Sequence, residues 1–321
     1  MDFTKWNSIE NHYQKGIFER WIYLNPELNN IDVEITEKIH GANFSILVSP
    51  CEKAKFASRN SVLEEDAKFY GFQEVFEREE YVGLIKFLEV LSRKHDAEIQ
   101  LYGELYGGKI QKGVFYGTEK NFRWYSLRWN GAIYPPQKAA IILNNFLHLK
   151  APAVGVFNVG GDLIKFIDEV ETEFQSNLTP KEYTERNICE GVVMVPYEQN
   201  FWNQSSLLLI KKKNEEFKDK SHARKHERVE KVIPENVQEL TDEALSYINE
   251  NRTNDLQSKN GEFNDIKDIS KFAKEYFNDL FSDFEKDNYT EWHCLDKLEQ
   301  GYIKKVIGKN IFQELKISLL R

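Results

Sequence analysis

Two alternating segments separated by a glycine-containing turn constrain the fold more than any other feature of the sequence. Apolar residues recur at positions 31, 33 and 35 and again at 44, 46 and 48, with mostly polar residues between them. A two-residue period is typical of strands with one buried face, so the segments predict two half-buried strands. Gly41 permits a sharp turn between them, and the sequence predicts a tight, hairpin-like connection that carries Lys38.

Lys38 in this connection is either a nucleophile or an ordinary turn lysine. A lysine amine has a free pKa of about 10.4, so at neutral pH it is protonated and a poor nucleophile. Neighbouring cations and partial desolvation can remove the proton near neutrality, which would allow the amine to attack a phosphorus atom. The alternative is an exposed lysine without a chemical role, and the short motif alone leaves both interpretations open.

Length and composition indicate a globular protein with a substantial core. The 321 residues leave room for one large or two ordinary domains, and 41% of them are hydrophobic. No apolar run approaches the roughly 18 residues needed to span a bilayer, and the first residues lack a signal-peptide pattern, so we expect a cytoplasmic protein without a membrane partner. Cys51, Cys189 and Cys294 are too widely spaced to indicate a disulfide framework or a zinc site.

The charge distribution restricts any polyanion site to a local patch. The chain has 43 basic and 52 acidic residues and a net charge of −9, which argues against attraction of the whole surface to nucleic acid. Residues 211–231 nevertheless contain nine Lys/Arg against five Asp/Glu. This segment is therefore the expected contact for a polyanion.

The hydrophobic pattern divides the chain into a mixed part and a helical part. Strand-like runs occupy residues 99–104, 122–129, 189–195 and 207–211, whereas apolar residues past Pro234 recur at steps of three and four. We therefore predict the α+β class. A domain of strands and helices would cover residues 1–232, and a small all-helical domain would cover residues 233–321, with the basic segment as the linker.

Several weak motifs acquire meaning when they are taken in order. A candidate nucleophile, an arginine, two strand-end glutamates, an aromatic strand and a final pair of lysines follow one another along the chain. Covalent transfer of a nucleotide requires such a set, because developing negative charge on phosphate oxygens needs fixed cations. The members are Lys38 with Asn43, Arg59, Glu104, the strand from Phe122 to Tyr125, Glu190, Lys211 and Lys213.

With these motifs, the chain resembles the RNA ligase 2 family of ATP-dependent polynucleotide ligases, which belongs to the covalent nucleotidyltransferases. The resemblance spans most of residues 1–220. DNA ligases and capping enzymes typically carry Asp-Gly after the lysine motif, whereas this chain carries His40-Gly41, as the RNA ligase 2 branch does. The most specific matches are Glu37 to Ser45, Gly103-Glu104, Gly108 to Lys112, Tyr116-Gly117, Glu190-Gly191 and Ile210 to Asn214.

The resemblance implies a fold, a reaction and a set of partners. The fold would be an ATP-grasp-like nucleotidyltransferase domain of antiparallel sheets with flanking helices, followed by a helical domain that docks RNA. Lys38 would attack the α-phosphate of ATP, AMP would pass to an RNA 5′-phosphate, and an RNA 3′-hydroxyl would displace AMP. The implied co-substrate is ATP with Mg²⁺ or Mn²⁺, the implied substrate is a nicked RNA duplex, and the protein is expected to be a monomer.

The resemblance also implies roles for the residues at the phosphates. Lys38 would be the nucleophile, and Glu190 would support the metal ion, which prefers carboxylate and water oxygens. Lys211 and Lys213 would contact the α-phosphate and lower the pKa of Lys38. Lys212 would point to the opposite side of its strand.

The remaining implied roles concern the nucleoside and the RNA. Arg59 and Glu104 would hold the ribose and phosphate region, and Glu37 would read the adenine base. Tyr125 would stack on adenine, although Trp124 and Phe122 compete for that role because a slip of one residue exchanges the faces of a strand. The expected RNA contacts are Asn43, Lys225 and Arg228.

Two other functions remain open at the level of the sequence. The same scaffold could seal DNA or hybrid ends, and a comparison of RNA and DNA 3′-hydroxyl ends at one nick would separate these activities. A catalytically silent nucleic-acid-binding module could use residues 211–231, and such a protein would acquire no covalent label from α-labelled ATP.

Overall fold

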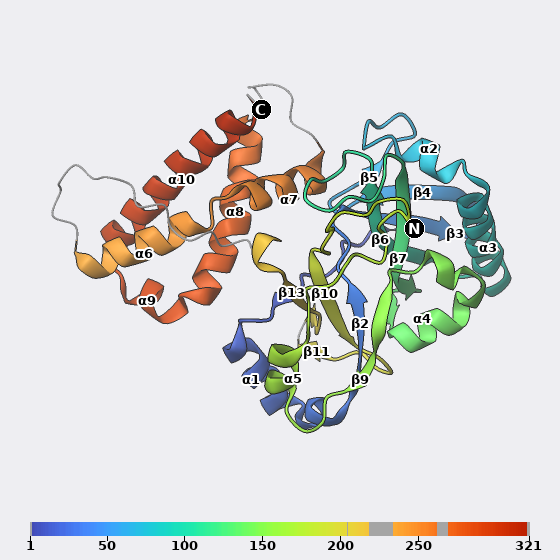
Figure 1. Cartoon of the computed structure of the whole chain (residues 1–321), viewed down its shortest axis with the longest axis horizontal. Coiled ribbons are helices and arrows are strands. Elements are labelled where there is room, and N and C mark those ends of the chain that lie inside the picture. The colour runs from blue at the N-terminus through green and yellow to red at the C-terminus, as the bar shows by residue number, and fades with distance from the viewer. Residues whose placement is uncertain (1, 204, 218–233, 262–268, 320–321) are drawn as a thin grey trace. The chain divides into compact units, whose positions relative to one another are not determined.

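The computed structural model describes residues 2–203, 205–217, 234–261 and 269–319 (Figure 1). The chain divides into two compact units, residues 1–216 and residues 217–321. The described strands lie in the first unit, and the described part of the second unit is mainly helical. The α+β class and the helical C-terminal region predicted from the sequence are confirmed.

A five-stranded sheet forms one half of the first unit. Its strands, in spatial order, are β1 (Glu10–Asn11), β13 (Ile210–Lys213), β10 (Gly191–Pro196), β2 (Asp32–Glu37) and β9 (Ala153–Asn158). All neighbours are antiparallel except β1 and β13. Apolar side chains of β2, β10 and β13 form a core with those of α1 (Lys15–Leu24), η1 (Pro26–Asn30) and α5 (Leu163–Glu169).

A six-stranded antiparallel sheet forms the other half. Its spatial order is β5 (Val62–Leu63), β4 (Glu52–Ser58), β3 (Ala42–Ser49), β6 (Ile99–Gly107), β7 (Lys120–Trp129) and β8 (Ala132–Tyr134). One face packs against α2 (Phe72–Phe76), α3 (Glu79–His95), α4 (Pro136–Ile142) and η2 (Asn144–Leu149), as Figure 1 shows. A short ribbon of β11 (Trp202–Asn203) and β12 (Ser206–Leu207) and the turn η3 (Glu215–Phe217) complete the described elements before the helical part.

The predicted hairpin around Lys38 is wrong, because its two strands belong to different sheets. β2 pairs with β10 and β9, whereas β3 pairs with β4 and β6. Neither strand is half-buried, since nearly every residue of both is buried. Alternation of apolar and polar residues cannot distinguish a polar face in water from a polar face covered by other parts of the protein. In β2, the polar residue Glu34 is buried against Lys150. Lys38 therefore lies where the chain passes from one sheet to the other.

The second unit is built from amphipathic helices, α6 (Glu235–Ser246), α7 (Glu250–Asn260), α8 (Ile269–Asp287), α9 (Tyr289–Cys294) and α10 (Lys297–Leu319). The longest two bury a residue at nearly every fourth position, which places the buried side chains on one face of each helix. They are Ile269, Phe272, Tyr276, Leu280 and Phe284 of α8 and Ile303, Ile307, Ile311 and Leu315 of α10. In the described residues, no helix is both long and apolar enough to cross a membrane.

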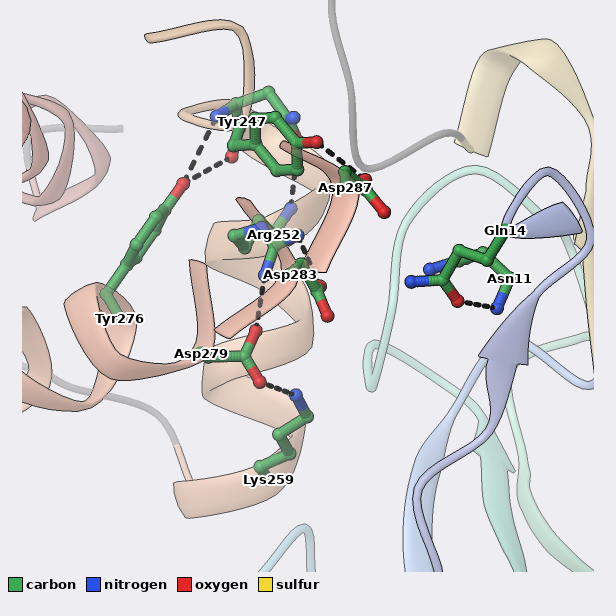
Figure 2. Close-up of polar contacts among 10 residues, drawn as sticks. Asn11, Gln14, Tyr247, Arg252, Lys259, Tyr276, Asp279, Asp283 and Asp287 are labelled. Carbon is green, nitrogen blue, oxygen red and sulfur yellow. Dashed lines mark hydrogen bonds and ion pairs between the residues drawn. The ribbon is translucent and has the colours of Figure 1, made fainter. Parts of the chain in front are cut away.

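A polar network fixes α7 against α8 (Figure 2). Arg252 is only 3% exposed, and its guanidinium lies 2.6 Å from Asp279 Oδ2 and 2.9 Å from Asp283 Oδ2. Lys259 Nζ lies 2.9 Å from Asp279 Oδ1, and the Tyr247 hydroxyl donates to Asp287 Oδ2 over 2.6 Å. The three aspartates repeat every fourth residue of α8, so the network consumes a whole acidic stripe of that helix.

Candidate active site

Glu190 is the centre of a buried cluster of charges. It directly precedes β10 and is 1% exposed. Its Oε2 lies 2.6 Å from Lys38 Nζ and 3.2 Å from His40 Nδ1, and its Oε1 lies 3.1 Å from Lys213 Nζ. The carboxylate of Glu190 therefore brings together two lysines, Lys38 and Lys213, that are far apart in the sequence.

Gly191 makes this approach possible. Its φ is +148°, and a Cβ there would lie 2.1 Å from the carbonyl oxygen of Lys212 on the neighbouring strand. Any larger residue would separate β10 from β13, where Gly191 pairs with Lys213. The Gly191 carbonyl also accepts from the backbone N–H of Lys38 over 2.9 Å, which holds the lysine beside the end of β10.

The charges around Glu190 decide its ionisation. Burial alone would raise the pKa of this carboxyl, but the nearby Lys38, Lys213 and His40 outweigh the desolvation and hold the pKa well below its usual range. Glu190 is therefore a permanent anion at neutral pH. A carboxylate with a depressed pKa is a weak base, so its role is to position cations and not to remove protons.

His40 is a member of this cluster that the sequence marked only as a feature of the family branch. The residue is buried, and its backbone N–H donates to the Tyr116 hydroxyl over 2.9 Å. Its ring contacts Glu190 through Nδ1, and its Nε2 lies 2.8 Å from the carbonyl oxygen of Lys112. The motifs His40-Gly41 and Tyr116-Gly117 were visible in the sequence, but nothing in their spacing showed that they meet.

A second group of candidate residues lies on the face of the six-stranded sheet opposite its helices. Asn43 pairs in register with Glu104, and the Asn43 amide donates to the Tyr125 hydroxyl. Burial, followed by the charge of Glu104, raises the pKa of Tyr125 well above 10, whereas the charge of Arg59 lowers it. The strand pairing, the hydrogen bond and the effects of Glu104 and Arg59 on the pKa of Tyr125 together indicate that these four residues lie close to one another.

A β-bulge decides which aromatic residue of β7 reaches that face. Gly103 pairs with Trp124 and Tyr102 with Ser126, so Tyr125 is the extra residue of the bulge. Phe122 and Trp124 are fully buried in the core on the helix-covered face. Tyr125 lies on the other face, where its ring centroid is 5.3 Å from that of Trp6. Tyr125 therefore remains the stacking candidate.

The three consecutive lysines of β13 have different surroundings. Lys212 Nζ donates to the carbonyl oxygens of Ile167, Asp168 and Val170 over 3.2, 2.7 and 2.8 Å, so it caps the end of α5. Its side chain thus leaves the strand away from Glu190, as predicted from strand alternation. Lys211 is half-buried and, by strand alternation, shares a strand face with Lys213.

Glu37 belongs to a different hydrogen-bond group from Glu190. Its Oε1 accepts from the Ser176 hydroxyl over 2.6 Å, and its Oε2 accepts from the backbone and side-chain amides of Asn177 over 2.8 and 3.2 Å. Burial raises the pKa of Glu37, and these hydrogen bonds partly counteract it. Glu37 therefore ties β2 to the segment around Asn177.

The predicted RNA contacts Lys225 and Arg228 lie outside the described residues.

The donor set around Glu190 fits a metal ion that is held by few protein ligands. Across residues 2–203, 205–217, 234–261 and 269–319, no group of three or more His, Cys, Asp or Glu residues could hold a metal by itself. Mg²⁺ in nucleotide sites usually takes one or two carboxylates together with water and phosphate oxygens. Among the described atoms, the buried Glu190 Oε1 accepts no hydrogen bond, but Lys213 Nζ lies 3.1 Å from it, so a metal ion bound here would share this oxygen with Lys213.

Comparisons with known proteins show the family and the fold of this chain. Residues 31–213 match the family model for RNA ligase, and residues 230–313 match the model for the T4 RNA ligase 2 C-terminal domain. An RNA ligase of Naegleria gruberi, solved as an apo mutant, has a similar fold with a TM-score of 0.50 and 14% identity over 67% of this chain. Another mutant of that enzyme, solved with ATP and Mn, gives a TM-score of 0.50 at 13% identity over 67% of this chain.

This chain covers 57% of the length of those Naegleria chains, and identities this low show the shared fold alone. The RNA ligase model by itself matches more than half of the 321 residues. The chain therefore belongs to the RNA ligase family, and its C-terminal match groups it with the RNA ligase 2-like members.

Proposed function

We propose that this protein is an ATP-dependent RNA ligase that seals nicks in duplex RNA through lysyl-AMP and RNA-adenylate intermediates. The observation that carries the proposal is the buried Glu190 carboxylate, with Lys38 at 2.6 Å and Lys213 at 3.1 Å. In a member of the RNA ligase family, this contact places the Lys38 amine beside the carboxylate that is expected to support the metal ion. A nucleic-acid-binding module would have no need to bury one carboxylate among two lysines and a histidine.

In the first step, the Lys38 amine would form a bond to the α-phosphorus of ATP. The bond between that phosphorus and the β-bridging oxygen breaks, and pyrophosphate leaves. The ion pair with Glu190 stabilises the protonated amine, so Lys38 must leave Glu190 and lose a proton to solvent before it attacks. Mg²⁺, held by Glu190 and phosphate oxygens, would neutralise the negative charge of the triphosphate.

Two further lysines would act on the phosphate in this step. Lys213 contacts Glu190 Oε1, whereas Lys38 contacts Oε2, and Lys213 is 7% exposed, so its charge acts in a poorly hydrated environment. Lys211 shares its strand face. Both would donate to the α-phosphate oxygens as negative charge develops on them, which lowers the barrier.

The second group of residues would serve the nucleoside and the RNA. Tyr125 would stack on the adenine, and Arg59 and Glu104 would hold the ribose and phosphate region. Asn43, beside Tyr125, would orient the RNA 5′-phosphate when it attacks the lysyl-AMP and displaces Lys38. The RNA 3′-hydroxyl then attacks the RNA-adenylate, the phosphodiester bond forms, and AMP leaves. Glu37, tied to Asn177, would read the base edge.

The proposal is tested by incubation of the purified protein with α-labelled ATP and Mg²⁺, followed by denaturation. We expect a covalent label on the protein that acid and hydroxylamine release but base does not, because a phosphoramidate bond has these properties. Ligation is then measured on nicked, gapped and single-stranded RNA and on the corresponding DNA, with nicked RNA expected to react fastest. A protein that binds RNA but never acquires the label would refute the proposal.

A further inference from the structure

One surface of α10 remains unassigned by the proposed mechanism. Helix α10 buries one stripe of residues, and a second stripe on the opposite side of the helix is exposed. The exposed residues follow one another at steps of three and four, so they form one line along the helix axis. They are Tyr302, Lys305, Lys309, Phe312 and Lys316.

The composition of this stripe, which we call the α10 stripe, is unusual for its surroundings. It combines two aromatic rings with three ammonium groups and contains no acidic residue. Tyr302 and Phe312 are each 37% exposed, and Lys316 Nζ lies 5.2 Å from the centroid of the Phe312 ring. Glu299 and Glu314, the acids of α10, fall at other angles around the helix.

The α10 stripe is a local cationic surface in an acidic domain. Residues 233–321 contain 18 Asp/Glu and 12 Lys/Arg, so the domain as a whole would repel a polyanion. The acidic stripe of α8, in contrast, is engaged by Arg252, Lys259 and Tyr247 (Figure 2). Negative charge is thus tied up on one helix, and positive charge is presented on another.

We propose that the α10 stripe binds the RNA strand, with Lys305, Lys309 and Lys316 on phosphates and Tyr302 and Phe312 against bases. The inference rests on the proposed function, which supplies the nucleic acid. At about 1.5 Å per residue, the lysines are about 6 and 10 Å apart along the axis, or roughly two and three phosphate spacings of one strand. The rings favour RNA over an acidic protein or a membrane, because each unpaired base beside a nick or gap offers a face for stacking.

The first test removes the charges. The full-length triple variant Lys305→Ala/Lys309→Ala/Lys316→Ala is compared with wild type for binding to a fluorescent nicked RNA duplex at several salt concentrations. The magnitude of the slope of log affinity against log salt should fall by about one for each lysine removed. The matched control removes three exposed lysines of α8, Lys271, Lys274 and Lys286, and should keep the wild-type slope within about half a unit.

The second test removes the rings. Tyr302→Ala/Phe312→Ala should bind an RNA duplex with a single-stranded gap, whose unpaired bases are open to stacking, at least about fivefold more weakly. The salt slope should be unchanged, because stacking is independent of counterion release. Circular dichroism checks that each variant is folded. Equal losses in the α8 control and the stripe variant, or wild-type binding by both stripe variants, would overturn the inference.

Two further readouts separate the inference from the proposed function and from other partners. Both stripe variants should still form protein–AMP at the wild-type rate, because the stripe serves RNA and not ATP. A wild type that forms no protein–AMP, but whose RNA binding still depends on the stripe, would refute the proposed function and support the inference. Stripe-dependent binding to vesicles of phosphatidylcholine and phosphatidylserine, without stripe-dependent RNA binding, would overturn the inference.

Discussion

Replacement of Glu190 by glutamine should destabilise the first unit of the chain, because it leaves the buried cation of Lys213 without its carboxylate. Lys213 is 7% exposed, and its Nζ lies 3.1 Å from Glu190 Oε1, so it cannot regain water where it stands. Removal of one partner from a buried ion pair typically costs about 3–5 kcal/mol. Lys213 can instead lose its proton, which at pH 7 costs at most about 4.6 kcal/mol, from a free pKa of about 10.4. The expected loss is therefore about 3–4.6 kcal/mol.

The assay uses Cys189, which is buried beside Glu190, as a probe of this unit. In a background in which the two exposed cysteines are serine, pulse labelling of Cys189 across a urea series gives the unfolding free energy of the first unit. The measurement is made at pH 7 with a chelator present. The matched control is Glu52→Gln, which breaks an exposed ion pair with Lys55 and should leave the midpoint unchanged.

The pH dependence of this difference follows from the pKa of Glu190. The folded-state pKa lies below the unfolded value of about 4.3, so the contribution of Glu190 is fully present above that value and is lost as pH falls through the folded pKa. The gap between wild type and Glu190→Gln should therefore close in strong acid. Equal stability of the two proteins at pH 7 would refute the description of Glu190 as a buried ion-pair centre.

Three other predictions concern reactivity, the lysines of β13 and the domain division. Burial raises the pKa of Cys189 to about 11. At pH 8, a thiol reagent should therefore modify the two exposed cysteines of the native protein and reach Cys189 only after unfolding. Rapid modification of all three cysteines would contradict the buried position of Cys189. Lys213→Ala should slow protein–AMP formation about 100-fold or more, whereas Lys212→Ala should stay within about tenfold of wild type, and equal effects would contradict their opposite orientations. The fragment 1–232 should form protein–AMP yet fail to transfer AMP to RNA, and an insoluble or unlabelled fragment would contradict the proposed domain division.

The sequence predicted the charged centre of the site better than its framework. The resemblance selected one set of residues, Lys38, Glu190 and Lys213. In the structure, both lysines contact the carboxylate of Glu190. The order of the short motifs was sufficient to predict this set of residues. Each motif carries a charge, and a buried charge needs a partner of opposite sign. The roles of these residues in the reaction stay predictions.

The path of the chain around Lys38 could not be predicted by the same reasoning. Residues 32–49 have the pattern of a hairpin, but strand pairing depends on partners more than a hundred residues away, such as β9 and β10 for β2. Polar residues of β2 that suggested an exposed face are buried because Lys150 and Ser176 complement Glu34 and Glu37. Hydrophobic periodicity carries no information about such distant polar partners.

The choice among the aromatic residues of β7 also required the structure. A single extra residue in the ladder, at Tyr125, reverses which side chains face the core on either side of it. Phe122 and Trp124 point into the core before the bulge, and Leu127 does so after it. The sequence could name the three candidates but could not locate the bulge that selects one of them.

If Lys38 carries AMP, two ligation reactions of Lys38→Ala should have different outcomes. With ATP and an ordinary RNA 5′-phosphate, this variant should form neither protein–AMP nor sealed product. With RNA that already bears a 5′-adenylate, it should seal the nick at a rate comparable to wild type, because the final step does not use the amine as carrier. Loss of both activities in a folded variant, or persistence of the label on another residue, would contradict the account.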